Sequence, residues 1–257
     1  MSQAKLCNIF LQKEIINVPD IWVYIITFLA SVLTLLTGFG LGTILTAAFA
    51  LIYDVKVAIF LVAIVHFLNN VFKFSLFRKS VDFTIIKRFG IISILGALLG
   101  SFLQVWVQSE IVKIMLGVVL IVLGLAEFVP ENWSLRLPQK IDVIGGFFSG
   151  FLGGLVGNQG AIRSAYLLNY EISKETFIAT ATVIAMCIDA TRIPVYITLN
   201  YQMIEQFQWT LAAVVAIAFF GTIIGKRLLS KVPQFLFKKI VAVFVILMGF
   251  LFTVHII

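Results

Sequence analysis

A short polar segment at residues 157–164 interrupts an otherwise apolar run that extends from about residue 141 to residue 170. Near its end is Arg163, and an arginine inside a lipid bilayer is costly unless it faces a cavity or a partner. Irregular backbone at this depth is likewise tolerated only where protein encloses it. The planar guanidinium group suits a two-point contact with an oxyanion such as a carboxylate, sulfonate or sulfite. The candidate substrate contacts of this segment are Arg163, Gln159, Asn158, Gly160 and Ser164.

A second interruption, at residues 37–43, divides the apolar run between residues 21 and 53. Its glycines alternate with larger residues, and Gly42 lies 118 positions before Gly160. A pair of glycine-interrupted apolar segments in the two halves of a chain indicates the binding site of a membrane transporter. We therefore expect the two interruptions to meet, and we add Gly40, Gly42 and Thr43 to the candidate substrate contacts.

In this interpretation, the second arm of each interrupted segment begins near the middle of the membrane. The free N–H groups at the start of a helix, together with the helix dipole, attract an anion without any charged side chain. A structural alternative is that Arg163 is paired with Asp189 and that the glycines only permit close helix packing. The two roles are compatible, so both stay open at this point.

Further polar residues lie on the apolar runs that follow the interruptions. His66, Asn69 and Lys73 share one helical face and are expected along a cavity. Asn69 is a candidate substrate contact, whereas His66 and Lys73 are candidates for gating or coupling. The alternatives are a packing role for His66 and an extension of Lys73 to the membrane surface. Asp189 and Arg192 are three residues apart, so they either neutralise each other or form a gate that responds to the anion.

The composition defines the class of protein. Hydrophobic residues make up 61% of the 257 residues, charged residues only 12%, and the mean hydropathy is +1.10. Because a soluble domain carries about 25% charged residues, the chain is an integral membrane protein. It has room for about six to eight spans of about 20 residues. The formal net charge of +7 comes from basic residues between apolar runs. Such residues orient a membrane protein, so nucleic-acid binding is not expected.

The motifs of enzymes and metalloproteins are missing from the sequence. Cys7 and Cys187 are isolated, which argues against a disulfide framework and a metal site. His66 and His255 lie in separate halves, and no paired acids or nucleophile motif occurs. We therefore expect neither an enzyme nor a cofactor.

The order of the apolar runs repeats. An interrupted run and three conventional spans occur in residues 21–129 and again in residues 141–257, with a linker at residues 130–140. The most basic turns, near Lys79 and Lys231, are predicted to be cytoplasmic and the turn near Glu205 external. These predicted sides are consistent with the number of membrane crossings only if each interrupted run enters the membrane and returns.

The predicted fold is an all-α integral membrane protein that forms one membrane domain. It consists of two inverted repeats, each a glycine-broken re-entrant helical hairpin plus three transmembrane helices. We expect it to cross the cytoplasmic membrane several times with both termini external.

Three segments carry a resemblance to a known family. They are TGFGLGTILTAAFAL at residues 37–51, GFLGGLVGNQGAIRSAYLLN at residues 150–169 and SKETFIATATVIAMCIDATRIPVY at residues 173–196. With the spans around them, they resemble the TauE/SafE family of sulfite and organosulfonate exporters over nearly the whole chain. The resemblance implies transport of a small sulfur-containing or carboxylate anion across the cytoplasmic membrane.

The sequence thus favours a secondary transporter of a small anion, of the sulfite, thiosulfate, organosulfonate or short-carboxylate class. In an alternating-access cycle, one inverted half moves against the other while the substrate lies between the hairpin tips. An anion channel that uses the same site is the alternative. The expected partners are the anion and the lipid bilayer, and formation of a homodimer stays open.

Overall fold

The computed structural model describes residues 21–37, 40–126, 128–129, 141–167, 170–228 and 234–254. Every regular element in these ranges is helical, which confirms the all-α prediction. Cys7, the predicted linker at residues 130–140, Lys231 and both chain ends lie outside the described residues. Five segments are long and apolar enough to cross a membrane: Val55–Ser80, Phe83–Trp106, Ser109–Ala126, Lys174–Thr198 and Ile204–Leu228. The chain is therefore a multi-pass membrane protein.

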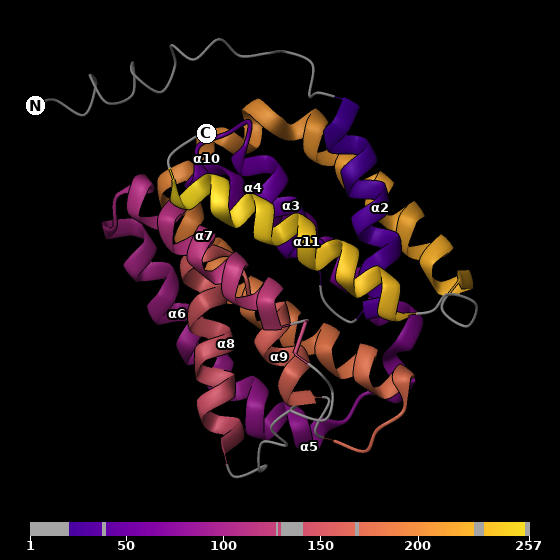
Figure 1. Cartoon of the computed structure of the whole chain (residues 1–257). Coiled ribbons are helices and arrows are strands. Elements are labelled where there is room, and N and C mark those ends of the chain that lie inside the picture. Colours follow the sequence, from indigo (N-terminus) through magenta and orange to yellow (C-terminus); the bar gives the residue numbers. More distant parts are fainter. Residues whose placement is uncertain are drawn as a thin grey trace, which may run out of the picture.

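The helices follow the same order in both halves of the chain (Figure 1). Two short helices separated by a glycine-containing break come first, and longer helices follow. The first half contains α2 (Ile21–Thr37), α3 (Leu41–Ala50), α4 (Val55–Phe77), η1 (Arg78–Ser80), α5 (Phe83–Ile85), η2 (Ile86–Gly90), α6 (Ile91–Trp106) and α7 (Ser109–Ala126). The second half contains α8 (Asp142–Val156), α9 (Gly160–Leu167), α10 (Lys174–Leu228) and α11 (Gln234–Thr253).

Helix α10 folds back on itself. Its 55 residues would span about 82 Å if straight, yet both of its arms lie along the 23-residue helix α4. The first arm runs antiparallel to α4 and the second runs parallel to it. The contacts that fix these directions are Phe60–Tyr196 and His66–Asp189 for the first arm, and Tyr53–Phe207 and Phe72–Phe219 for the second. The chain reverses direction between Tyr196 and Phe207, where we expected a turn, although the polar stretch 202–208 itself is helical.

The helices α8 and α9 form a hairpin. Helix α8 ends at Gly157, whose φ of 77° lies in the left-handed region that glycine adopts without strain. Helix α9 then returns beside α8, because the Tyr166 ring packs against Gly145. The Tyr170 hydroxyl donates a hydrogen bond to the Asp142 carboxylate, which closes the open end of the hairpin. Burial and this hydrogen bond raise the pKa of Tyr170 to about 12.

The two pairs of short helices open toward opposite ends of α4, here called the Tyr53 end and the Phe77 end. Helix α8 runs parallel to α6, and Gly146 lies beside Phe89 at the start of that span, near the Phe77 end. Helix α2 runs parallel to the second arm of α10, since Phe28 lies beside Gly221 and Val32 beside Gly225. Because that arm begins where Phe207 contacts Tyr53, α2 starts at the Tyr53 end.

Glycines let the first helix of each pair approach a span from the other half of the chain. A Cβ atom at Gly150 of α8 would lie 1.9 Å from the backbone oxygen of Ser93 in α6. At Gly225 of α10, a Cβ atom would lie 2.5 Å from the backbone oxygen of Val32 in α2. No side chain fits at such distances, so these helices touch backbone to backbone. Each half therefore contributes a short helix that is packed into the other half.

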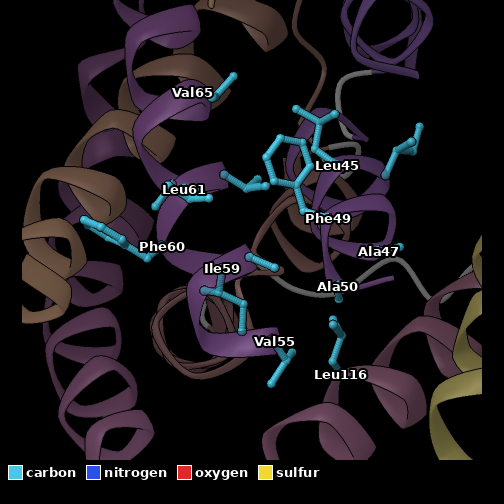
Figure 2. Close-up of a cluster of buried hydrophobic side chains, with 14 of the residues drawn as sticks. Leu45, Ala47, Phe49, Ala50, Val55, Ile59, Phe60, Leu61, Val65 and Leu116 are labelled. Carbon is cyan, nitrogen blue, oxygen red and sulfur yellow. The ribbon is translucent and has the colours of Figure 1, made fainter. Parts of the chain in front are cut away.

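The hydrophobic core surrounds α3, all of whose residues are buried. Figure 2 shows Leu45 and Phe49 of α3 facing Ile59 and Leu61 of α4, with Leu116 of α7 nearby. Ten residues give a helix only about 15 Å long, half the apolar thickness of a bilayer. Helix α3 therefore begins inside the protein, where Thr43 of its first turn contacts Asn158, and it runs from there toward the Tyr53 end.

Candidate functional site

The two glycine-containing breaks meet at the centre of the molecule. Thr43 Oγ1 donates a hydrogen bond to Asn158 Oδ1 at 3.0 Å, and this bond joins the start of α3 to the loop before α9. A narrow cavity of about 20 Å³ lies beside this contact, which is enough to hold a water molecule. Its lining comes from Thr34, Gly40, Gly42, Thr43, His66, Asn70, Lys73, Gly157, Gln159, Gly160, Arg163, Ile178, Ala181 and Thr182.

Two helix N-termini contribute to the cavity wall. Gly40, Gly42 and Thr43 belong to the start of α3, and Gln159 and Gly160 to the start of α9. The first N–H groups of a helix have no partner within that helix, and the helix dipole adds partial positive charge there. The glycines leave this backbone open to the cavity. The lining is thus electropositive even before charged side chains are considered.

Two basic side chains also line the cavity. Arg163 and Lys73 are each only 4% exposed. Arg163 Nη1 lies 3.4 Å from Gln159 Oε1, while its buried Nε has no hydrogen-bond partner. Within the described ranges, neither Arg163 nor Lys73 is in an ion pair. Two basic side chains therefore face the cavity without a carboxylate partner among the described residues.

The buried Asp189 carboxylate is occupied by other groups. It accepts hydrogen bonds from Gln159 Nε2 at 2.9 Å and Arg192 Nε at 3.0 Å. His66 Nδ1 lies 2.7 Å from its other oxygen. Arg192 also reaches the Gly153 carbonyl oxygen at 2.7 Å. The expected Asp189–Arg192 pair is present, whereas Arg163 is linked to Asp189 only through Gln159. The alternative of a direct Arg163–Asp189 pair was therefore wrong.

Most of the residues predicted from the two breaks and the following spans gather here. Eight line the cavity: Arg163, Gln159, Gly160, Gly40, Gly42, Thr43, His66 and Lys73. Asn158, Asp189 and Arg192 lie beside it through the hydrogen bonds given above. Ser164 is buried but is not part of the lining.

Asn69 was expected on the cavity face, and this placement was wrong. Its Oδ1 accepts a hydrogen bond from Thr222 Oγ1 at 2.9 Å, so the side chain faces the second arm of α10. Asn70 lines the cavity instead and lies 3.2 Å from His66 Nδ1. The helical face that contains residues 66 and 73 can include either residue 69 or residue 70, because these two residues are adjacent in the sequence.

The sequence interpretation also missed lining residues that carry no charge. These are Thr34, Asn70, Gly157, Ile178, Ala181 and Thr182. Ile178, Ala181 and Thr182 have the spacing of one helical face, the only sequence signal that they give. This spacing is common in buried helices, so it does not mark a binding site.

Membrane-length apolar helices around a buried cavity with excess positive charge define a class, the multi-pass membrane proteins with an internal polar site. Comparison with protein families narrows this class. The model of the sulfite exporter TauE/SafE family matches residues 23–252, and the chain belongs to this family. No curated protein and no solved structure matches it significantly. The match confirms the resemblance carried by residues 37–51, 150–169 and 173–196, and it identifies the chain as a membrane transporter of the sulfur-anion type.

Proposed function

We propose that the protein is a secondary transporter that holds a small anion in the cavity between the starts of α3 and α9. The observation that carries this proposal is the pair of buried basic side chains, Arg163 and Lys73, that line the cavity without a carboxylate partner. Leaving buried charge uncompensated is costly. An anion between the two helix N-termini provides the missing charge and accepts hydrogen bonds from free N–H groups.

The proposed substrates are sulfite, thiosulfate, an organosulfonate or a short carboxylate. The narrow cavity suits an anion of few atoms, and the guanidinium of Arg163 fits the paired oxygens that these anions share. The family description names sulfite, which makes sulfite the first compound to test.

The proposed cycle is alternating access by two inverted repeats. Its support is the arrangement of the short helices, which open toward opposite ends of α4 while their breaks touch through Thr43 and Asn158. Such paired broken helices around a central site are the pattern of several transporter folds. In this proposal each short pair enters the membrane and returns, so the cavity opens to one side at a time.

The test is counterflow in proteoliposomes. Vesicles preloaded with unlabelled sulfite should take up radiolabelled sulfite transiently above equilibrium, and the initial rate should saturate with concentration. An anion channel would instead give a flux without counterflow that rises almost linearly with concentration. Liposomes without protein provide the background. Absence of both kinds of flux for all four proposed anion classes would contradict the proposed function.

The proposed orientation places the Phe77 end in the cytoplasm and both termini outside. The Phe77 end carries Arg78, Lys79, Lys226 and Arg227, and cytoplasmic loops are enriched in such residues. In a background without Cys7 and Cys187, Glu205→Cys should react with an impermeant thiol reagent in intact cells. Lys79→Cys should react only after permeabilisation. Labelling of Lys79→Cys in intact cells would reverse the orientation.

A further inference from the structure

We infer that the cavity is built for an anion with two negative charges, of which Lys73 neutralises one and Arg163 the other. This inference rests on the proposed function and adds the charge of the substrate to it. It also changes the role of Lys73 from the gating or coupling role that its position in the sequence suggested to a direct contribution to specificity.

The charged residues around the cavity leave two basic groups without a carboxylate partner. Helix α4 contributes His66 and Lys73, and α9 contributes Arg163. From α10, Asp189 and Arg192 form an ion pair at 2.9 Å, so their charges cancel. The lining residues from α2 and α3 carry no charge: Thr34, Gly40, Gly42 and Thr43.

Neither of the buried carboxylates among the described residues is available to balance Lys73 and Arg163. Asp189 is fully buried and already contacts Arg192, Gln159 and His66. The other described buried carboxylate, Asp142, accepts the hydrogen bond from Tyr170 at the open end of the α8–α9 hairpin. Because Lys73 and Arg163 line the same cavity, their positive charges would also repel each other. The missing negative charge must therefore come from the ligand.

A monoanion satisfies only part of this requirement. It leaves one of the two buried cations uncompensated, and a buried charge without a partner is strongly unfavourable. A dianion neutralises both at once. Because Lys73 belongs to the first half of the chain and Arg163 to the second, such an anion also links the two halves electrostatically.

Thiosulfate and methanesulfonate form a suitable pair of probes. Each has a sulfur atom with three oxygens and one further heavy atom. That atom is a sulfur in thiosulfate, a dianion, and a methyl carbon in methanesulfonate, a monoanion. A difference in their binding therefore reports mainly on charge.

The experiment measures the dissociation constants of both anions for the detergent-purified full chain. The parent protein should bind thiosulfate at least about tenfold more tightly than methanesulfonate. Lys73→Gln should weaken thiosulfate binding by about ten- to a hundredfold and change methanesulfonate binding much less. Lys73→Arg should keep the preference, because it keeps the charge. The matched control, Lys226→Gln, removes an exposed lysine outside the cavity and should change neither constant.

A second variant separates specificity from folding. Lys73→Met removes the charge with a side chain of similar length, so the anion-free protein should melt at a higher temperature than the parent. The same variant should lose most of the thermal stabilisation that thiosulfate gives to the parent. Equal binding of both probes by the parent, or an equal loss for both in Lys73→Gln, would overturn the dianion inference while anion binding itself stands. Binding of neither probe by the parent would overturn the inference together with the proposed binding site.

Discussion

Replacing Arg163 with glutamine should weaken sulfite binding by about ten- to a hundredfold. Arg163 lines the cavity at the start of α9, and its buried Nε has no hydrogen-bond partner within the protein. A hydrogen bond between charged groups contributes about 1.5–3 kcal/mol, and about 1.4 kcal/mol corresponds to one decade in affinity. Arg163→Lys should restore only part of the affinity, because lysine keeps the charge but loses the planar arrangement of donors.

Direct binding to purified variants provides the measurement, after monodispersity has been established. Arg227→Gln is the matched control, since Arg227 is exposed at the end of α10. Gln159→Ala should have a smaller direct effect, about 0.5–1.5 kcal/mol for a neutral hydrogen bond. That variant also removes a donor from Asp189, so its melting temperature must be compared with that of the parent. If folded Arg163→Gln binds sulfite as tightly as the parent, the proposed site is wrong.

Asp189→Asn should destabilise the protein by about 3–5 kcal/mol. The carboxylate is fully buried and holds Arg192 and Gln159 through hydrogen bonds, with His66 Nδ1 at 2.7 Å. Asparagine keeps one oxygen but leaves Arg192 without a counter-charge in the interior. The loss should appear as a lower melting temperature and as a lower midpoint of denaturation in detergent.

One further variant and one further measurement determine what Asp189 does. Asp189→Asn combined with Arg192→Gln removes both charges of the pair and should recover part of the lost stability. If Asp189 carries coupling protons instead, the single variant should stay folded and exchange sulfite, but its uptake should no longer respond to a pH gradient. A stable Asp189→Asn variant with normal pH-driven uptake would exclude both roles.

The glycine content of the two breaks made the centre of the protein predictable. A helix cannot easily continue through Thr37–Thr43 or Gly157–Gln159, and Arg163 within an apolar run requires a polar environment. These two local constraints were enough to predict that residues 42 and 160 belong to one site. Five of the six conventional spans that hydropathy predicted are membrane-length segments in the described ranges, because each depends only on its own composition.

The details that depend on packing were not predictable. His66 and Gln159 reach Asp189 from distant parts of the chain, whereas Arg192 is its neighbour on the same helix. Only this last contact has a sequence spacing that identifies it. Whether position 69 or position 70 faces the cavity depends on how α4 is rotated against α10, and no local pattern fixes that rotation. The helical conformation of residues 202–208, next to the reversal of α10, was hidden for a similar reason.

The backbone contacts at Gly150 and Gly225 define which helices can move together. Helix α8 belongs to the second half of the chain but is packed against Ser93 of α6, and α2 of the first half is packed against α10. Separating the two halves along the sequence would break both contacts, which have no side chains that could slide or rearrange. If the protein works by the proposed alternating access, we therefore expect α2 to move with the second arm of α10 and α8 to move with α6. This expectation differs from a cycle in which one whole half of the sequence moves against the other, because each half holds a short helix of its partner by backbone contact.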